Sequence, residues 1–148
     1  MAVTVTDGSF DAGARSNAML AAAEGAGAAV TFTGVVRSTA ERPITALILE
    51  CYVELAEHEI AAMVAEATRR FALIDADVIH RHGRLVPGEL IMQVTTLAAH
   101  RQAAFDGAQF LMDYLKTGAP FWKQEETVEG VAWVEAKAAD DRARERWG

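Results

Sequence analysis

The amino-acid sequence predicts an α+β fold in which helices flank a mostly antiparallel sheet, within a single compact domain over residues 1–148. Three observations predict this class. A length of 148 residues suits one domain, and 51% hydrophobic residues are enough to form a core. Strand patterns also follow one another across short turn signals such as Pro87-Gly88, which is typical of hairpins and not of regular βαβ units.

Four segments have the composition or the periodicity of helices. Residues 9–24 are rich in alanine, and residues 54–71 carry apolar side chains at helical spacing. Residues 100–117 form the third expected helix, with Gly118 as its C-cap. The residues expected to face inward from this helix are Ala104, Phe105, Ala108, Met112 and Leu115. The charged tail from residue 138 is the fourth expected helix.

Six segments have the alternating or β-branched character of strands. They are residues 28–36, 44–53, 76–82, 89–99, 121–126 and 131–135. The Pro87-Gly88 turn is expected to pair 76–82 with 89–99 in antiparallel fashion, and Glu129-Gly130 separates the last two strands. The polar segment 38–43 ends in proline and is expected to be a mobile loop.

Charge and cysteine content argue against several functional classes. The net charge of −7 argues against general nucleic-acid binding. Cys51 is the single cysteine, so neither an internal disulfide nor a cysteine cluster for zinc is possible, and we expect a reducing, cytoplasmic location. No secretory signal is visible, and the uncharged stretch 25–36 is too short to span a membrane.

Basic residues at the ends of the expected elements are the candidate functional groups. Lys116 closes the helix 100–117, and Lys123 follows it beyond a Gly-Ala-Pro break. Two lysines joined by a rigid turn can converge on one pocket and act there as acid, base or nucleophile. The alternative for a lysine at a helix C terminus is a favourable contact with the helix dipole and nothing more.

Two further basic positions suit an anion. Arg37 ends the expected strand 28–36, beside the loop 38–43, and His100-Arg101 lies where a strand gives way to a helix. A helix N terminus offers free N–H groups and the positive end of the dipole, so a His-Arg pair there favours anion binding. The alternatives are an ordinary strand-end arginine and a helix-start pair bound to a nearby carboxylate.

Other reactive side chains carry weaker signals. His80 and His82 alternate with Arg81 on an expected strand, so the two histidines share one face. Two histidines without an acidic or thiol companion are a weak metal site, and we expect no metal. Cys51 lies within an expected strand, where a buried structural thiol is the favoured interpretation over a nucleophile.

Five segments together resemble one known family. They are TFTGVVR (31–37), ITALILECY (44–52), VIHRHGRLVPGE (78–89), TTLAAHRQAAFDGAQFLMDYLKTGAPFWKQE (95–125) and GVAWVEAK (130–137). Their order and spacing are similar to those of the large, catalytic subunit of molybdopterin synthase, over about residues 27 to 137. The resemblance implies an α/β hammerhead-like fold.

The resemblance also implies a function. The family's enzyme is a sulfurtransferase of molybdenum cofactor biosynthesis that converts cyclic pyranopterin monophosphate into molybdopterin by building its dithiolene. Sulfur arrives as a thiocarboxylate on the C-terminal Gly-Gly of a small ubiquitin-like subunit, so the large subunit needs no cofactor of its own. Two large subunits form a central homodimer with one small subunit at each end, which makes a heterotetramer.

By resemblance, site roles fall on the basic residues noted above. Lys116 matches the catalytic lysine, and Lys123 matches a second lysine that acts in catalysis and substrate binding. The resemblance implies further substrate contacts for Arg37, His100, Arg101, Gln124, Glu125 and Lys137, the last of which reaches the pocket of the other subunit.

The sequence departs from the family pattern at two positions. Val35 stands where some relatives carry lysine, and Gln124 stands where a basic residue is common, which puts one pterin contact and part of the tail or phosphate binding in doubt. Two rival hypotheses also stay open. One is a non-catalytic binding module for a ubiquitin-like tail or a small anion, and the other is a structural dimer whose basic clusters are ion pairs.

Overall fold

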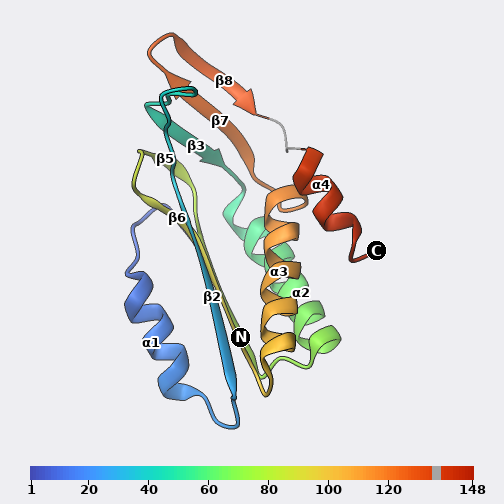
Figure 1. Ribbon diagram of the computed structural model, residues 1–148. Helices are drawn as coiled ribbons and strands as arrows, with labels where there is room; N and C mark the ends of the chain where they lie inside the picture. Colours follow the sequence, from blue (N-terminus) through green and yellow to red (C-terminus); the bar gives the residue numbers. More distant parts are fainter. Residues whose placement is uncertain (135–137) are drawn as a thin grey trace.

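The computed structural model describes residues 1–134 and 138–148 (Figure 1). The strands are β1 (Ala2–Thr6), β2 (Ala28–Val35), β3 (Ala46–Glu50), β4 (Asp75–Arg81), β5 (Gly83–Leu85), β6 (Leu90–Ala98), β7 (Trp122–Thr127) and β8 (Gly130–Val134). The helices are α1 (Ala12–Ala22), α2 (Val53–Phe71), α3 (Arg101–Thr117) and α4 (Ala138–Glu145). The four expected helices and the six expected strands are therefore all present, with boundaries shifted by a few residues.

The strands form two four-stranded sheets. The main sheet has the order β1-β4-β6-β2, and the second sheet has the order β5-β3-β7-β8. Every pairing is antiparallel except that of β1 with β4. The antiparallel pairing of β4 with β6 confirms the hairpin expected around Pro87-Gly88, and the arrangement confirms the α+β class.

Two strands were not expected. β1 carries the alternating sequence AVTVT, which is a strand signal, and it pairs in parallel with β4. β5 is only three residues long, too short for a periodicity to be visible, and it pairs with β3. The strand expected over residues 44–53 is also shorter, because Cys51 and Tyr52 already lead into α2.

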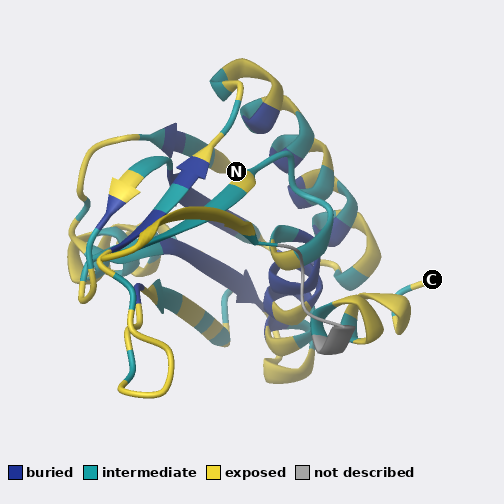
Figure 2. Cartoon of the chain, turned by 90° about the horizontal axis from the view of Figure 1, so that it is seen from above, coloured by how far each residue is buried: buried dark blue, intermediate teal, exposed yellow. Residues whose placement is uncertain are grey.

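The main core lies between one face of the main sheet and the helices α2 and α3 (Figure 2). Ile60 and Val64 of α2 and Leu111 of α3 are buried in it against Val78 and Val94 of the sheet. Removing such side chains from water stabilises the fold by about 1.5–3 kcal/mol each. None of the helices described is long and apolar enough to cross a membrane.

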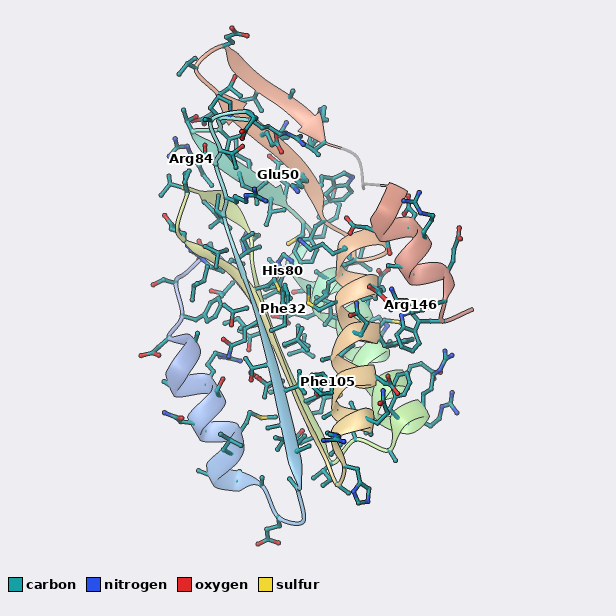
Figure 3. The ribbon with its side chains drawn as sticks, in the orientation of Figure 1. Phe32, Glu50, His80, Arg84, Phe105 and Arg146 are labelled. Carbon is teal, nitrogen blue, oxygen red and sulfur yellow. The ribbon has the colours of Figure 1, made fainter. Side chains whose placement is uncertain are left out.

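The prediction that Phe105 faces inward is wrong. Its side chain is 57% exposed, whereas Ala104 and Ala108 on the same helix are buried. At about 100° per residue, Phe105 lies within about 20° of the buried Met112 on the helix wheel, but two turns nearer the N terminus of α3. This side of the helix is therefore covered towards its C-terminal end and left open at Phe105. Figure 3 shows Phe105 on the flank of α3.

Helix α1 covers the opposite face of the main sheet through polar contacts (Figure 1). Arg15 Nη2 lies 2.9 Å from Oδ1 of the buried Asp77, and Nε2 of the buried Gln93 donates to the carbonyl oxygen of Ala12 at 3.2 Å. No residue of α1 is fully buried. This side of the sheet therefore depends on paired polar groups rather than on an apolar core.

Candidate active site

A pocket opens where the end of α3 meets the second sheet. One part of it, here called the cationic lobe, has a volume of about 420 Å³. Its charged lining residues are Arg37, Arg42, Lys116, Lys123, Glu125 and Asp140. Four basic side chains against two acidic ones make this lobe suitable for an anionic ligand.

A second part, here called the apolar lobe, adjoins the first and has a volume of about 220 Å³. Its lining is mostly apolar and includes Leu47, Leu49, Ile91, Met112, Leu115 and Phe121. Lys116 and Lys123 line both lobes, together with Leu47, Ile91 and Val134. The two lysines therefore stand at the boundary between a polar chamber and an apolar one.

Local structure explains why the two lysines meet. Lys116 lies in the last turn of α3, which ends at Gly118, whose N–H donates to the carbonyl oxygen of Tyr114 at 2.7 Å. Pro120 follows and cannot continue a helix, so the chain turns into β7. Lys123 lies on β7, opposite Leu49 of β3.

The cationic lobe is closed on one side by the segment that follows β2. Arg37 and Thr39 of this segment line the lobe, and Arg42 Nη2 lies 3.0 Å from the carboxylate of Glu125. Ser38 Oγ accepts a hydrogen bond from the N–H of Ile44 at 2.9 Å, so the segment expected to be a mobile loop is held by hydrogen bonds.

His80 lines the apolar lobe from the end of β4. Its ring is 6% exposed and stacks on Phe121 with 4.0 Å between ring centroids. Burial, opposed by a hydrogen bond to the backbone of Arg81 and reinforced by the positive charge of Lys116, lowers the pKa of His80 to about 4. The ring is therefore neutral at physiological pH.

The structure brings together four of the predicted site residues, Arg37, Lys116, Lys123 and Glu125. Gln124 lies between two of them on β7 but lines neither lobe, because alternate residues of a strand point to opposite faces. Lys137 lies outside the described residues.

His100 and Arg101 are not brought to this pocket within one chain. They are exposed at the first turn of α3, whereas Lys116 lies in its last turn. The stretch from Arg101 to Lys116 measures about 22 Å at 1.5 Å per residue.

Sequence reasoning missed three polar residues that line the cationic lobe. Arg42 and Thr39 belong to a segment without periodicity, and Asp140 comes from α4, far away in the sequence. His80 was considered only as a metal ligand. Its position two residues from the buried Val78 on the same strand face was the signal that could have placed it inside. Among the described residues, no group of three His, Cys, Asp or Glu side chains is arranged to hold a metal ion.

Fold and site together define a two-sheet α+β protein with a lysine-containing anion pocket between a helix C terminus and a β-hairpin. The family model described as MoaE protein matches residues 5–118. The molybdopterin synthase catalytic subunit of Cereibacter sphaeroides is 52% identical over 147 residues, which cover 99% of this chain and 100% of that relative. The chain belongs to the MoaE family.

Solved structures agree with this assignment. The molybdopterin biosynthesis MoaE protein from Burkholderia ambifaria superposes with a TM-score of 0.83 at 41% identity, covering 100% of this chain and 99% of that one. A complex of subunits 1 and 2 of molybdopterin-converting factor from Helicobacter pylori contains the same fold, with a TM-score of 0.71 at 19% identity over 92% of this chain and 90% of that one. The predicted family and enzyme class are thereby confirmed.

Proposed function

We propose that this chain is a catalytic subunit that transfers sulfur from the C-terminal thiocarboxylate of a small ubiquitin-like subunit to cyclic pyranopterin monophosphate. The product is molybdopterin with its dithiolene. The observation that carries the proposal is the position of Lys116 and Lys123 on both lobes of one pocket, in a chain half identical to a molybdopterin synthase catalytic subunit.

The two lobes have different tasks. The cationic lobe, at about 420 Å³, falls within the roughly 300–1,000 Å³ usual for small-molecule sites and takes the cyclic phosphate substrate. Arg37 and Lys123 supply charged donors for its phosphate oxygens. The apolar lobe, at about 220 Å³, is below that range and takes the narrow glycine tail of the partner.

Lys116 is the main catalytic group. At the boundary of the two lobes, it lies where the tail carbonyl of the partner and the reacting carbon of the substrate meet. It serves there as general acid and base, or as a transient covalent handle on the tail carbonyl. A dithiolene needs two such transfers, each from one tail. In each, the bond from the tail carbonyl carbon to sulfur breaks and water supplies the oxygen that makes the tail a carboxylate. The sulfur bonds to a substrate carbon in place of a C–O bond, whose oxygen is displaced.

His100 and Arg101 take part through a second copy of the chain. In this arrangement a two-fold axis passes near the middle of α3, so the α3 helices of the two copies lie side by side and antiparallel. The first turn of α3 in the second copy then lies beside Lys116 of the first copy. The exposed Phe32 and Phe105 supply apolar surface for such a contact, and β2 is an edge strand of the main sheet (Figure 3). The resulting homodimer has two complete sites, and its interface is expected to bury at least about 1,000 Å².

The small subunit joins each site through its tail. The Helicobacter pylori structure is likewise a complex of two subunits of one factor. Val131 and Trp133 are exposed on β8, an edge strand of the second sheet, and they offer an apolar surface for a protein partner near the pocket. A cytoplasmic location suits this function, and Cys51, a free thiol whose pKa is raised by burial, suits a reducing compartment.

A reconstitution experiment tests the proposal. The chain is mixed with cyclic pyranopterin monophosphate and with a small subunit that carries either a thiocarboxylate or a carboxylate at its C terminus. Molybdopterin is expected only with the thiocarboxylate, in amounts set by the sulfur supplied. If the tail binds but no molybdopterin forms, the chain is a non-catalytic binding module.

A further inference from the structure

His80 presents an unpaired hydrogen-bond acceptor to the apolar lobe. Its Nδ1–H donates to the carbonyl oxygen of Arg81 at 2.8 Å. A carbonyl oxygen only accepts, so the neutral ring must carry its proton on Nδ1 and leave a lone pair on Nε2. The hydrogen bond to the carbonyl oxygen of Arg81, on the same strand β4, thus fixes the tautomer of the His80 ring.

The Nε2 atom can be reached from the apolar lobe. It has no hydrogen-bond partner among the described residues. Among those residues, two side-chain polar atoms are both fully enclosed and without a hydrogen-bond partner, Arg81 Nε and the hydroxyl of Tyr114. His80 Nε2 also lacks a partner but is not enclosed in this way, so it is accessible from the lobe that His80 lines. A nearly buried acceptor that opens only onto a pocket is costly unless a ligand or water satisfies it.

The ring is also rigid and uncharged. Stacking on Phe121, with 19° between the ring planes, fixes its orientation under β3 and β7 and beside the end of α3 (Figure 3). A charged imidazolium would stand beside the positive Lys116, and burial disfavours it further. The apolar lobe therefore has cationic donors at its boundary and one fixed acceptor deeper inside.

This arrangement selects a ligand with an anionic end and an N–H donor close to it. The C-terminal glycine of a peptide has both groups, because its carboxyl carbon and its N–H are separated by a single Cα. Once Lys116 and Lys123 hold the terminal carboxylate or thiocarboxylate, the next polar group upstream is that N–H. Glycine also has no side chain to meet the apolar walls.

We propose that Nε2 of His80 accepts a hydrogen bond from the N–H of the terminal glycine of the partner's tail and thereby makes the apolar lobe specific for a peptide C terminus. This inference rests on the proposed function, since it assumes that the tail enters this lobe. His80 is then a residue that determines specificity and fixes the position of the tail carbonyl relative to Lys116.

A double-mutant cycle tests the inference directly. A small subunit is prepared by semisynthesis with an ester in place of the last peptide bond, which removes the N–H donor and keeps the length of the tail. The weaker carbonyl acceptor of the ester is the same in every comparison and cancels between variants. Its affinity for the chain is compared with that of the all-amide subunit by titration calorimetry, for the wild-type chain, His80→Phe and His80→Gln. The matched control is His82→Phe, since His82 is the neighbouring histidine and does not line the lobe.

The ester is expected to weaken binding to the wild-type chain and to His82→Phe by about five- to tenfold, the usual net contribution of one hydrogen bond. In His80→Phe, which keeps an aromatic ring against Phe121, amide and ester tails should bind equally. The His80→Gln chain restores an acceptor oxygen and should again prefer the amide. Because each comparison is made within one variant, a general loss of stability does not imitate this pattern.

Two results would overturn the inference in different ways. An ester penalty of equal size in the wild-type chain and in His80→Phe would show that His80 is not the acceptor, while leaving the proposed function intact. If a small subunit without its last two glycines bound as tightly as the full one, the tail would not enter the pocket. The proposed function and the inference would then both fail.

Discussion

Lys116, in the last turn of α3, and Lys123, in β7, line both the cationic lobe and the apolar lobe of one pocket. The residues between them form the helix C-cap and the proline turn that reverse the chain. Two ligands that enter from different lobes therefore meet at these side chains. This relationship is the basis of the predictions for catalysis below.

Arg37→Ala should weaken substrate binding more than it slows the chemical step. A charged hydrogen bond to phosphate is worth about 1.5–3 kcal/mol, so KM for cyclic pyranopterin monophosphate should rise by about tenfold or more. Steady-state kinetics at saturating small subunit measure this change. Arg84→Ala is the matched control, because Arg84 is exposed and paired with Glu126 outside the lobes. A fall in kcat alone would instead place Arg37 in the chemistry.

Mixed dimers test whether His100 and Arg101 act across subunits. Arg101→Ala and Lys116→Ala homodimers should both be poorly active at low substrate concentration. After unfolding and refolding an equal mixture, half of the dimers contain one chain of each kind, and one of their two sites is intact, so about a quarter of wild-type activity should return. Activity no higher than the mean of the two parents would show that Arg101 serves its own chain.

His80 should make stability depend on pH. Its pKa is lowered in the folded chain from 6.5 to about 4, so the unfolded chain binds the proton more readily. The stability linked to this group is complete above pH 6.5, falls as the pH drops towards 4, and changes by up to about 3 kcal/mol in total. Urea unfolding at several pH values should show this loss in the wild-type chain relative to His80→Phe. Parallel pH profiles for the two chains would contradict it.

The ion pair between α1 and the main sheet should matter more than an exposed pair of similar geometry. Arg15→Ala leaves the carboxylate of Asp77, which is 5% exposed, without its partner, and this should cost about 3 kcal/mol. Arg69→Ala breaks the exposed pair with Glu66 at 2.6 Å and should cost less than about 1 kcal/mol. Equal losses in urea unfolding would show that α1 contributes little to this face.

Local patterns predicted most of the fold. Helical periodicity located α2 and α3, and the Pro87-Gly88 turn gave the pairing of β4 with β6. Periodicity did not reveal β5, which has too few residues. It also did not reveal the exposure of Phe105, because a helical stripe does not define how far along the helix the covering surface extends. Both depend on tertiary packing.

The part of the candidate site that could be predicted consists of residues that lie at the ends of neighbouring helices and strands. Lys116, Lys123 and Arg37 meet in one pocket because a short turn and the junction of the two sheets bring them together. His100 and Arg101 were expected to bind the same substrate, but α3 places them about 22 Å from Lys116 along its axis. The helix expected over residues 100–117 already implied this separation. His80 could have been placed inside by its alternation with the apolar Val78 on one strand, but a lone histidine does not show which ligand it faces.

The initial rate of molybdopterin formation by Lys116→Ala tests the central claim most directly. The substrates are cyclic pyranopterin monophosphate and the thiocarboxylated small subunit, both at saturating concentration. We predict a fall of at least about 10²-fold, the lower end for loss of general acid–base catalysis, with the midpoint of thermal unfolding nearly unchanged. Turnover close to that of the wild-type chain would contradict the assignment of Lys116 as the catalytic group.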